Sequence, residues 1–342
     1  MRMAEVEPEA AGFVSDSKQA KCGHKRSLND DESSLGMLIY RHPQYSTMSQ
    51  LEKLISTDDG LTIWSEAFGK PTDSPVLLIM GAMNQGIVWP DNFCQKLAEA
   101  GNFVIRYDHR DTGKSSTVDF QNQPYDLDSL TQDAVAVLRG YKVRKATIVG
   151  LSMGGYIAQL IAINHPGFVD RLILISTSAD HRPYMAATMG QSTANFSLPP
   201  PEDKFLDYIR YTVATPPKTA IDIEENLIRG WEVTYGGTRM FPREHIVQTI
   251  RLSAMRSKNQ TSIFNHARAV LASPDRLELV KLISVPTLII HGRYDACFPI
   301  AHAEYLAKNI QNSQLVILEM GHSFMWSWSD EVLSNISRFI AH

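Results

Sequence analysis

The sequence predicts an α/β protein in which a mostly parallel, doubly wound sheet carries an inserted helical cap. Short apolar runs alternate with amphipathic stretches from about residue 60 to 180, the alternation stops for about a hundred residues, and it resumes at residue 285. Because parallel strands need crossover helices between them, this alternation indicates an open sheet with helices on both faces. A long block without strand patterns, placed between two strands of one sheet, indicates a cap over the sheet edge.

The expected elements follow one another in chain order. Strands are predicted where apolar residues form short runs, at residues 63–68, 75–80, 103–107, 146–151, 171–176, 285–291 and 315–318. Helices are predicted where apolar side chains recur every three or four residues, at residues 89–100, 127–138 and 154–164, around Tyr305, and at 332–340. The intervening block looks helical and irregular, because proline pairs and a glycine pair interrupt it at residues 199–201, 216–217 and 236–237.

These patterns divide the chain into three parts. Residues 51–180 and 285–342 form the predicted α/β core, and residues 181–284 form the predicted cap. Residues 1–50 mix both charge signs with few large apolar side chains. Such a segment cannot bury enough surface to order itself, so it is predicted to be a disordered tail. A regulatory or docking role for the tail is the alternative.

Composition favours small-molecule chemistry over binding to nucleic acid or membranes. The 342 residues are 44% hydrophobic, and 33 basic against 37 acidic residues give a net charge of -4 without a dense basic run. No apolar run approaches the ~18 residues that a membrane-spanning helix needs. Cys22, Cys94 and Cys297 have neither disulfide-framework nor zinc-site spacing. We therefore expect a cytoplasmic protein without metal or cofactor, whose partner is a small-molecule ester; the oligomeric state is left open.

The pentapeptide Gly150-Leu-Ser-Met-Gly154 places Ser152 between a predicted strand and a predicted helix. A nucleophile at such a sharp turn sits in strained backbone, and side chains two residues to either side would collide, so glycine is needed there. The helix start supplies unpaired N–H groups and a positive dipole end where an oxyanion would form. We predict that Ser152 is a nucleophile; a purely structural glycine turn is the alternative.

An acyl-transfer serine needs a base and an acid that orients the base. In this arrangement the acid and then the histidine follow the serine along the chain, each after a late strand. Asp295 follows the predicted strand at 285–291, and His322 follows the last one. They are the predicted acid and base, with Asp180 as the competing acid and a plain turn histidine as the alternative for His322.

The predicted oxyanion hole combines two backbone N–H groups. One belongs to Met153, directly after the nucleophile, and the other to Ala82, in the loop after an early strand. An aromatic and methionine-rich set in the cap, with residues beside the site, is predicted to bind an apolar substrate, although a cap core of its own is the alternative for each member. The substrate-binding candidates are Met83, Tyr184, Trp231 and Phe324.

Four segments together resemble a known family. They are Met80-Gly81, Trp89-Pro-Asp-Asn-Phe93, Arg106-Tyr-Asp-His-Arg-Asp-Thr-Gly-Lys-Ser115 and Gly150-Leu-Ser-Met-Gly154. From about residue 58 to 340 the chain resembles the α/β-hydrolase fold serine hydrolases, and among them aclacinomycin methylesterase and related bacterial esterases. The resemblance implies the same roles for Ser152, Asp295 and His322. Ala82 stands where that group has a second glycine, which narrows the pocket by a methyl.

The sequence therefore predicts a serine hydrolase that cleaves a carboxylic ester of a small, partly apolar molecule. A C–C bond hydrolase or a lactone hydrolase with the same triad is the alternative within enzymes. A ligand receptor on a hydrolase scaffold is the alternative from another class. The charged residues Asp108, Arg110 and Asp111 are predicted to pin their loop rather than to hold a metal.

Overall fold

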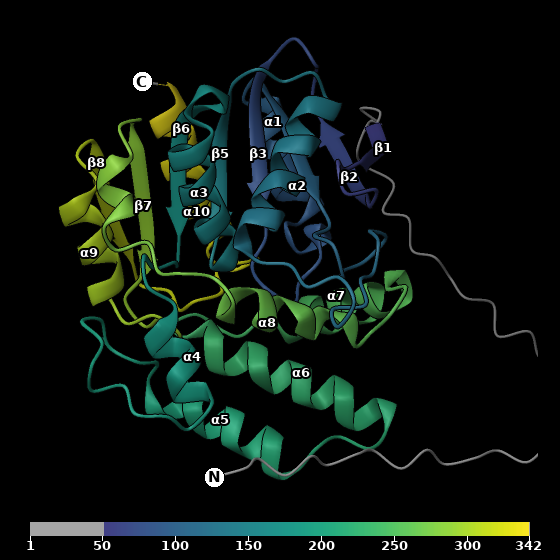
Figure 1. The fold of residues 1–342 in the computed structure, drawn as a ribbon, viewed down its shortest axis with the longest axis vertical. Coiled ribbons are helices and arrows are strands. Elements are labelled where there is room, and N and C mark those ends of the chain that lie inside the picture. The colour runs from purple at the N-terminus through teal and green to yellow at the C-terminus, as the bar shows by residue number, and fades with distance from the viewer. Residues whose placement is uncertain (1–50, 342) are drawn as a thin grey trace, which may run out of the picture. The chain divides into compact units, whose positions relative to one another are not determined.

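The molecule is built on an eight-stranded sheet, seen in a computed structural model that describes residues 51–341 (Figure 1). The order across the sheet is β1-β2-β4-β3-β5-β6-β7-β8. The β1–β2 and β2–β4 pairs are antiparallel, and the other pairs are parallel. The strands are β1 (Leu51–Ser56), β2 (Thr62–Phe68), β3 (Ser74–Ile79), β4 (Asn102–Tyr107), β5 (Ala146–Leu151), β6 (Val169–Ile175), β7 (Thr287–Gly292) and β8 (Ser313–Leu318).

Helices cover both faces of the sheet, so the predicted fold class is confirmed. Helices α1 and α10 pack on one face, and α2, α3 and α9 pack on the other. Side chains alternate between the faces along each strand, so that Val104 and Ile105 of β4 belong to opposite core clusters. The helices are α1 (Asp91–Glu99), α2 (Leu127–Gly140), α3 (Met153–Asn164), α9 (Ala301–Asn309) and α10 (Ser329–Ala341).

The register brings the carboxyl ends of the central strands level with one another. Gly150 of β5 lies opposite Ile79 of β3, and Leu151 lies opposite Ile175 of β6. The loops that follow these strands therefore begin side by side. Because the strands are parallel, the loops after β7 and β8 leave the same edge.

Strand β1 has no counterpart among the predicted strands. Among the described residues it pairs only with β2, as the first strand in the sheet order, and Ile55 is its one buried side chain. An edge strand that buries a single residue has too weak an apolar pattern to be recognised. Its position is held instead by long-range contacts, because the Tyr141 hydroxyl donates to the Leu51 carbonyl and the Lys53 amine donates to the Gly140 carbonyl.

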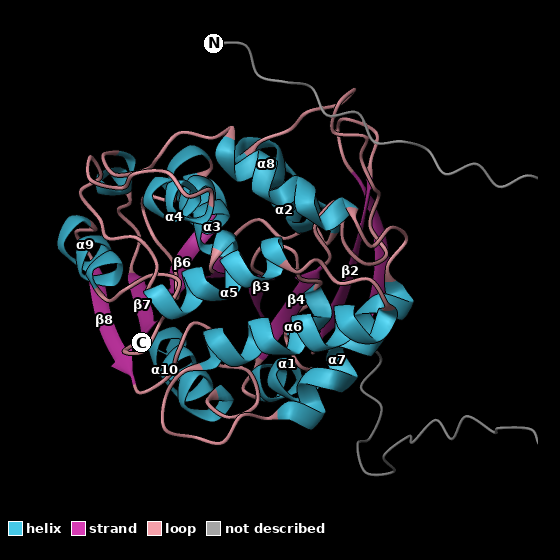
Figure 2. Cartoon of the chain, turned by 90° about the horizontal axis from the view of Figure 1, so that it is seen from below, coloured by secondary structure: helices cyan, strands magenta, loops and turns pink. Residues whose placement is uncertain are grey.

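Between β6 and β7 the chain forms five further helices. In Figure 1 they lie at the edge where the parallel strands end, and Figure 2 shows α5 and α6 crossing in front of the sheet. Helix α6 begins with a capping box, in which Thr219 and Asp222 satisfy each other's backbone N–H groups. These helices are α4 (Arg182–Thr188), α5 (Asp203–Ala214), α6 (Ala220–Tyr235), α7 (Arg243–Arg256) and α8 (Asn265–Leu271).

Helix α8 of this insertion packs on the core. Its Ala269 and Val270 are buried in the same cluster as the side chains of α2 and α3. The boundaries at 181 and 284 stay a prediction, and the predicted tail at 1–50 lies outside the described residues. Among residues 51–341, no helix combines the length and the hydropathy that crossing a bilayer requires.

Candidate active site

Ser152 sits in a strained turn between β5 and α3. Its φ of 55° and ψ of -120° lie outside the regions that L-residues usually occupy. The flanking glycines are required by contact, since a Cβ at Gly150 would lie 2.3 Å from the Gly154 carbonyl oxygen and one at Gly154 would lie 2.2 Å from the Ile79 oxygen. Strain of this kind is typical of functional turns, because it presents a side chain that a relaxed turn would not.

The backbone of Ser152 is held on both sides while its side chain stays half-buried. Its N–H donates to the Ile175 carbonyl at 3.0 Å, and its carbonyl accepts the Thr177 hydroxyl at 2.7 Å. Ser152 is followed by Met153, the first residue of α3, whose N–H has no partner inside the helix. The turn therefore offers a hydroxyl beside a free backbone donor.

The structure brings Asp295 and His322 into direct contact. His322 Nδ1 lies 2.9 Å from Oδ2 and 3.1 Å from Oδ1 of Asp295. Asp295 is 1% exposed, and its Oδ1 also accepts the N–H groups of Cys297 and Phe298 at 2.8 and 2.9 Å. Burial would raise the pKa of Asp295, but the imidazoles of His322 and His291 and the Phe298 N–H hold that pKa below its usual range. The carboxylate is therefore charged and aimed at Nδ1.

Among the described residues, His322 Nε2 has no hydrogen-bond partner, and the Ser152 hydroxyl makes no hydrogen bond to it. Both side chains are partly accessible and lie at the same edge of the sheet, after β8 and β5. In enzymes without substrate, the contact between nucleophile and base is often long and tightens on binding.

The competing acid is placed elsewhere. Asp180 accepts two hydrogen bonds from the Arg182 guanidinium, both at 2.8 Å, and these occupy both carboxylate oxygens. Burial opposes ionisation of Asp180, but the Arg182 contacts keep its pKa lowered. Its hydrogen bonds go to its own loop rather than to His322.

The loop after β3 lies against Ser152. A Cβ at Gly81 would lie 3.2 Å from the Ser152 Cβ, and Ala82 is the next residue. In the described part of the chain, the Ala82 N–H donates no hydrogen bond, and the neighbouring Met83 adopts a positive φ of 64°. Both predicted oxyanion donors thus lie in segments next to Ser152: Ala82 in the loop after β3 and Met153 at the start of α3.

The four predicted substrate-binding residues occupy different environments. Met83 is 38% exposed. The Tyr184 ring packs on Phe298 at 5.5 Å, and the Trp231 ring packs on Trp326 at 6.1 Å. Phe324 is fully buried in the core cluster formed with α1 and α10, so it presents no surface to a ligand. Phe324 was predicted to bind substrate because it follows His322 closely in sequence, but its ring points into the core.

Three residues beside the site were not singled out from the sequence. Phe298 packs its ring on His322 at 5.6 Å, and Thr234 accepts the His322 N–H at 2.8 Å. His266 accepts the Met83 N–H at 2.9 Å. Of these three, only Phe298 could have been suspected from the sequence, because it lies three residues after Asp295. Thr234 and His266 belong to the insertion, and their positions beside the site depend on how it packs.

Charged residues of the loop after β4 form a hydrogen-bonded network. Arg110 makes two hydrogen bonds of 2.7 Å to the buried Asp133. Asp108 accepts the Arg256 guanidinium at 2.7 Å, and Asp111 accepts backbone and side-chain donors of its own loop. These contacts pin the loop after β4 to α2 and α7.

A metal ion has one candidate set of ligands in residues 51–341. Ligand atoms of Asp295, Cys297 and His322 lie within 4.8 Å of one another. The Asp295 and His322 atoms are already joined by a hydrogen bond, and burial raises the pKa of the Cys297 thiol, which favours the protonated form. The arrangement therefore corresponds to an acid–base pair more closely than to a metal site.

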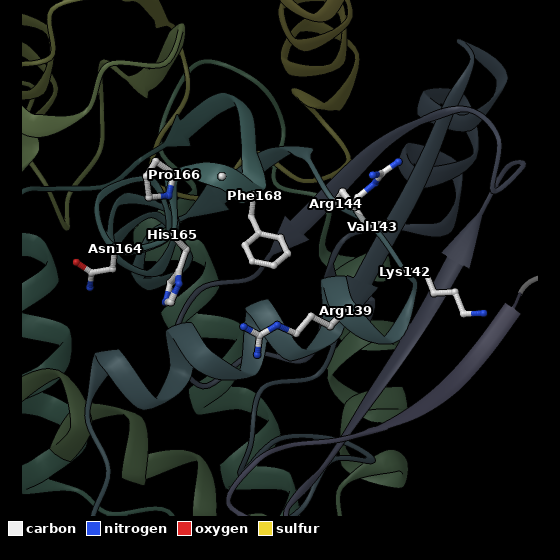
Figure 3. A pocket seen from close by; sticks show the side chains of 9 residues that line it. Arg139, Lys142, Val143, Arg144, Asn164, His165, Pro166 and Phe168 are labelled. Carbon is white, nitrogen blue, oxygen red and sulfur yellow. The ribbon is translucent and has the colours of Figure 1, made fainter.

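A surface pocket of about 860 Å³ lies near the amino ends of strands β5 and β6, whereas the candidate active site lies at the carboxyl ends (Figure 3). Its lining precedes β5 and β6, whereas Ser152 follows β5. The pocket holds no nucleophile beside a base, so it is not the candidate active site. Its lining consists of Arg139, Lys142, Val143, Arg144, Asn164, His165, Pro166, Gly167 and Phe168.

Comparison with known proteins identifies the class. Residues 74–327 match the alpha/beta hydrolase fold family. The chain is 34% identical over 274 residues to rhodomycin D methylesterase of Streptomyces peucetius, covering 78% of this chain and 91% of that protein. It is 28% identical over 258 residues to 3-oxoadipate enol-lactonase 2 of Acinetobacter baylyi, covering 75% and 84%. An esterase structure from Exiguobacterium antarcticum superposes with a TM-score of 0.69 at 23% identity, covering 85% of this chain and 100% of that one, which shows the shared fold.

The chain therefore belongs to the alpha/beta hydrolase fold family, and the resemblance to bacterial methylesterases is confirmed. With methylesterase relatives that it covers to 91% of their length, it is an enzyme of the carboxylic ester hydrolase class.

Proposed function

We propose that the protein hydrolyses a carboxylic ester through an acyl-enzyme on Ser152. The observation that carries this proposal is the contact of His322 Nδ1 with Asp295 at 2.9 Å, at the strand edge where Ser152 is held in a strained turn. Because the Asp295 carboxylate accepts a hydrogen bond from Nδ1, the neutral imidazole keeps its proton there. Nε2 is then left as the base.

The reaction begins when Ser152 Oγ attacks the ester carbonyl carbon and its proton passes to His322 Nε2. The C–Oγ bond forms, and the carbonyl π electrons move to the oxygen. Collapse of this intermediate breaks the bond to the leaving alkoxide, which takes the proton from Nε2. Water then attacks the acyl-enzyme with the same base, and the acid and the free serine are released.

The negative oxygen of the intermediate is stabilised by the N–H groups of Ala82 and Met153. Both flank Ser152, and the Met153 donor is reinforced by the positive end of α3. Asp295 stays ionised and stabilises the imidazolium that forms during the transfer.

The substrate in this proposal is a methyl ester of a partly apolar acid. One support is the relative named rhodomycin D methylesterase. A second is the aromatic surface that Trp231 and Trp326 form beside the His322 loop, with His245 packed on Trp326 at 6.1 Å. Flat aromatic faces favour an apolar or ring-shaped acyl part.

Labelling with an organophosphonate tests the nucleophile. The wild-type protein should gain one adduct by intact mass, located on Ser152 by peptide mapping, while Ser152→Ala should gain none and should lose ester hydrolysis. A folded wild-type protein without an adduct would refute the proposal. Turnover of matched methyl esters, longer alkyl esters, lactones and C–C bond substrates then separates the ester reaction from the alternatives; faster lactone opening would move the substrate assignment to a lactone.

A further inference from the structure

Two buried histidines hold the loop that carries the proposed oxyanion donor. His109 Nε2 donates to the Met80 carbonyl at 2.8 Å, and His266 Nδ1 accepts the Met83 N–H at 2.9 Å. Both histidines are 0% exposed, and their rings meet edge to face at 5.5 Å. Ala82 lies between the two anchored residues.

The hydrogen bonds of His266 define its tautomer. The Met83 N–H can only donate, so Nδ1 must be an unprotonated acceptor. The proton therefore sits on Nε2, which donates to the Arg110 carbonyl at 2.9 Å. Arg110 is itself fixed by two bonds of 2.7 Å to Asp133. Both ring nitrogens are thus satisfied, and the imidazole has one orientation.

Met83 needs such an anchor. Its φ of 64° is unfavourable for a residue with a side chain, and a loop peptide in this conformation persists only when its surroundings over-determine it. The bond to His266 is the one hydrogen bond that the Met83 N–H donates among residues 51–341. Without it, the Ala82–Met83 peptide keeps only the bond that its carbonyl accepts from the Asn84 amide at 3.0 Å. Met83 is then no longer held to α8, so Ala82 loses its support on that side, and the adjoining Gly81–Ala82 peptide, which carries the Ala82 N–H, can shift.

We propose that His266, carried by α8 of the insertion, is a positioning residue that aims the Ala82 N–H at the developing oxyanion. This inference rests on the proposed function. The acceptor at 266 acts through Met83 and does not touch the substrate. Burial lowers the pKa of His266, so the imidazole stays in the neutral form that can accept this bond.

Two variants, His266→Leu and His266→Asn, test whether the hydrogen-bond acceptor at this position matters. The two side chains have similar shapes, but only Asn offers an oxygen where Nδ1 stands. His266→Leu should lower kcat on the order of 10- to 100-fold with KM changed by less than about threefold, because the donor acts in the transition state. His266→Asn should recover kcat to within about fivefold of the wild type.

Asn265→Ala is the control that separates a general destabilisation of α8 from the loss of the bond to Met83. The Asn265 side chain donates hydrogen bonds to Asp111 and to the Val118 carbonyl, and within residues 51–341 it makes none to the loop after β3. Asn265→Ala should lower Tm by at least as much as His266→Asn does, while kcat stays within about threefold. A second readout is the inhibition constant of a trifluoromethyl ketone analogue, which should rise in parallel with the loss of kcat/KM in His266→Leu and stay constant in Asn265→Ala.

Three outcomes would overturn the inference: an unchanged kcat in His266→Leu, no recovery in His266→Asn, or an equal loss in Asn265→Ala. If His266→Leu does not fold, His266→Ala takes its place in the same comparison. Ser152→Ala separates this inference from the proposed function, since activity that survives in Ser152→Ala refutes the nucleophile, whereas a dead Ser152→Ala with a fully active His266→Leu refutes only the role of His266.

Discussion

The carbonyl oxygen of Thr234 accepts the backbone N–H of His322 at 2.8 Å. The next carbonyl, that of Tyr235, accepts the N–H of Gly321 at 2.8 Å. The end of α6 is therefore bonded directly to the loop that carries the proposed base. The insertion therefore contributes to the position of His322.

Gly321→Ala should break this junction. A Cβ at this position would lie 2.1 Å from the Tyr235 carbonyl oxygen, a contact that requires the backbone to move. We expect kcat/KM to fall by about tenfold or more and the unfolding free energy to fall by about 1–3 kcal/mol. Ester turnover and urea unfolding measure both. Gly167→Ala, where a Cβ meets nothing within 4 Å, is the control and should leave both quantities near those of the wild type.

Asp295→Asn should remove the charge that orients His322 while keeping the shape of the side chain. The amide can no longer hold the imidazole in the required tautomer, so kcat should fall about 10³- to 10⁴-fold. Asp180→Asn, at the competing acid, should keep kcat within about threefold. Steady-state kinetics of both variants decide between the two acids. A large loss of kcat in Asp180→Asn with a small loss in Asp295→Asn would make Asp180 the residue that orients His322.

Ser152→Gly should be inactive but more stable than Ser152→Ala. Glycine accepts the positive φ of 55° without a Cβ clash, whereas alanine keeps the strain. The gain is offset in part by the greater freedom of glycine in the unfolded chain, so we expect a difference of up to about 1 kcal/mol in the free energy of unfolding. Urea denaturation of the two variants at pH 7 measures it; a less stable Ser152→Gly would show that the strain released at this turn is smaller than the entropic cost of glycine.

His109→Gln should flatten the dependence of stability on pH. Burial, assisted by the neighbouring His266, lowers the pKa of His109 from 6.5 to about 3. Between these values the unfolded chain binds a proton that the folded chain does not, so stability is lost as the pH falls from 6.5 towards 3. Between pH 7 and pH 4.5 the wild type should lose about 2 kcal/mol more than His109→Gln. Equal slopes in urea titrations would contradict this origin.

Trp231→Ala should weaken binding of bulky esters selectively. Its ring packs on Trp326 at 6.1 Å, and the two rings form the proposed aromatic surface. Loss of one aromatic contact should raise KM for a methyl ester of a large aromatic acid by about tenfold. KM for p-nitrophenyl acetate, whose acyl group has two carbons and offers little surface to an aromatic face, should change by less than about twofold. An equal rise for both esters would indicate a general disturbance of α6.

Most of the architecture was predictable because it is encoded in local patterns. The parallel strands and their crossover helices follow from apolar periodicity, and the serine turn follows from glycines at 150 and 154, where a Cβ would clash. The edge strand β1 was missed because it buries a single side chain. The inward turn of the Phe324 ring, next to the half-buried His322, could not be deduced from adjacency in sequence.

Local sequence patterns thus determined the fold class and the candidate residues Ser152, Asp295 and His322, since each follows a strand whose end could be recognised. Tertiary structure decided how these residues are held. His266 meets Met83 across 183 positions, and Thr234 meets His322 through the end of α6. Such contacts depend on how an insertion without periodic strands packs on the core, and no local pattern of residues specifies that packing.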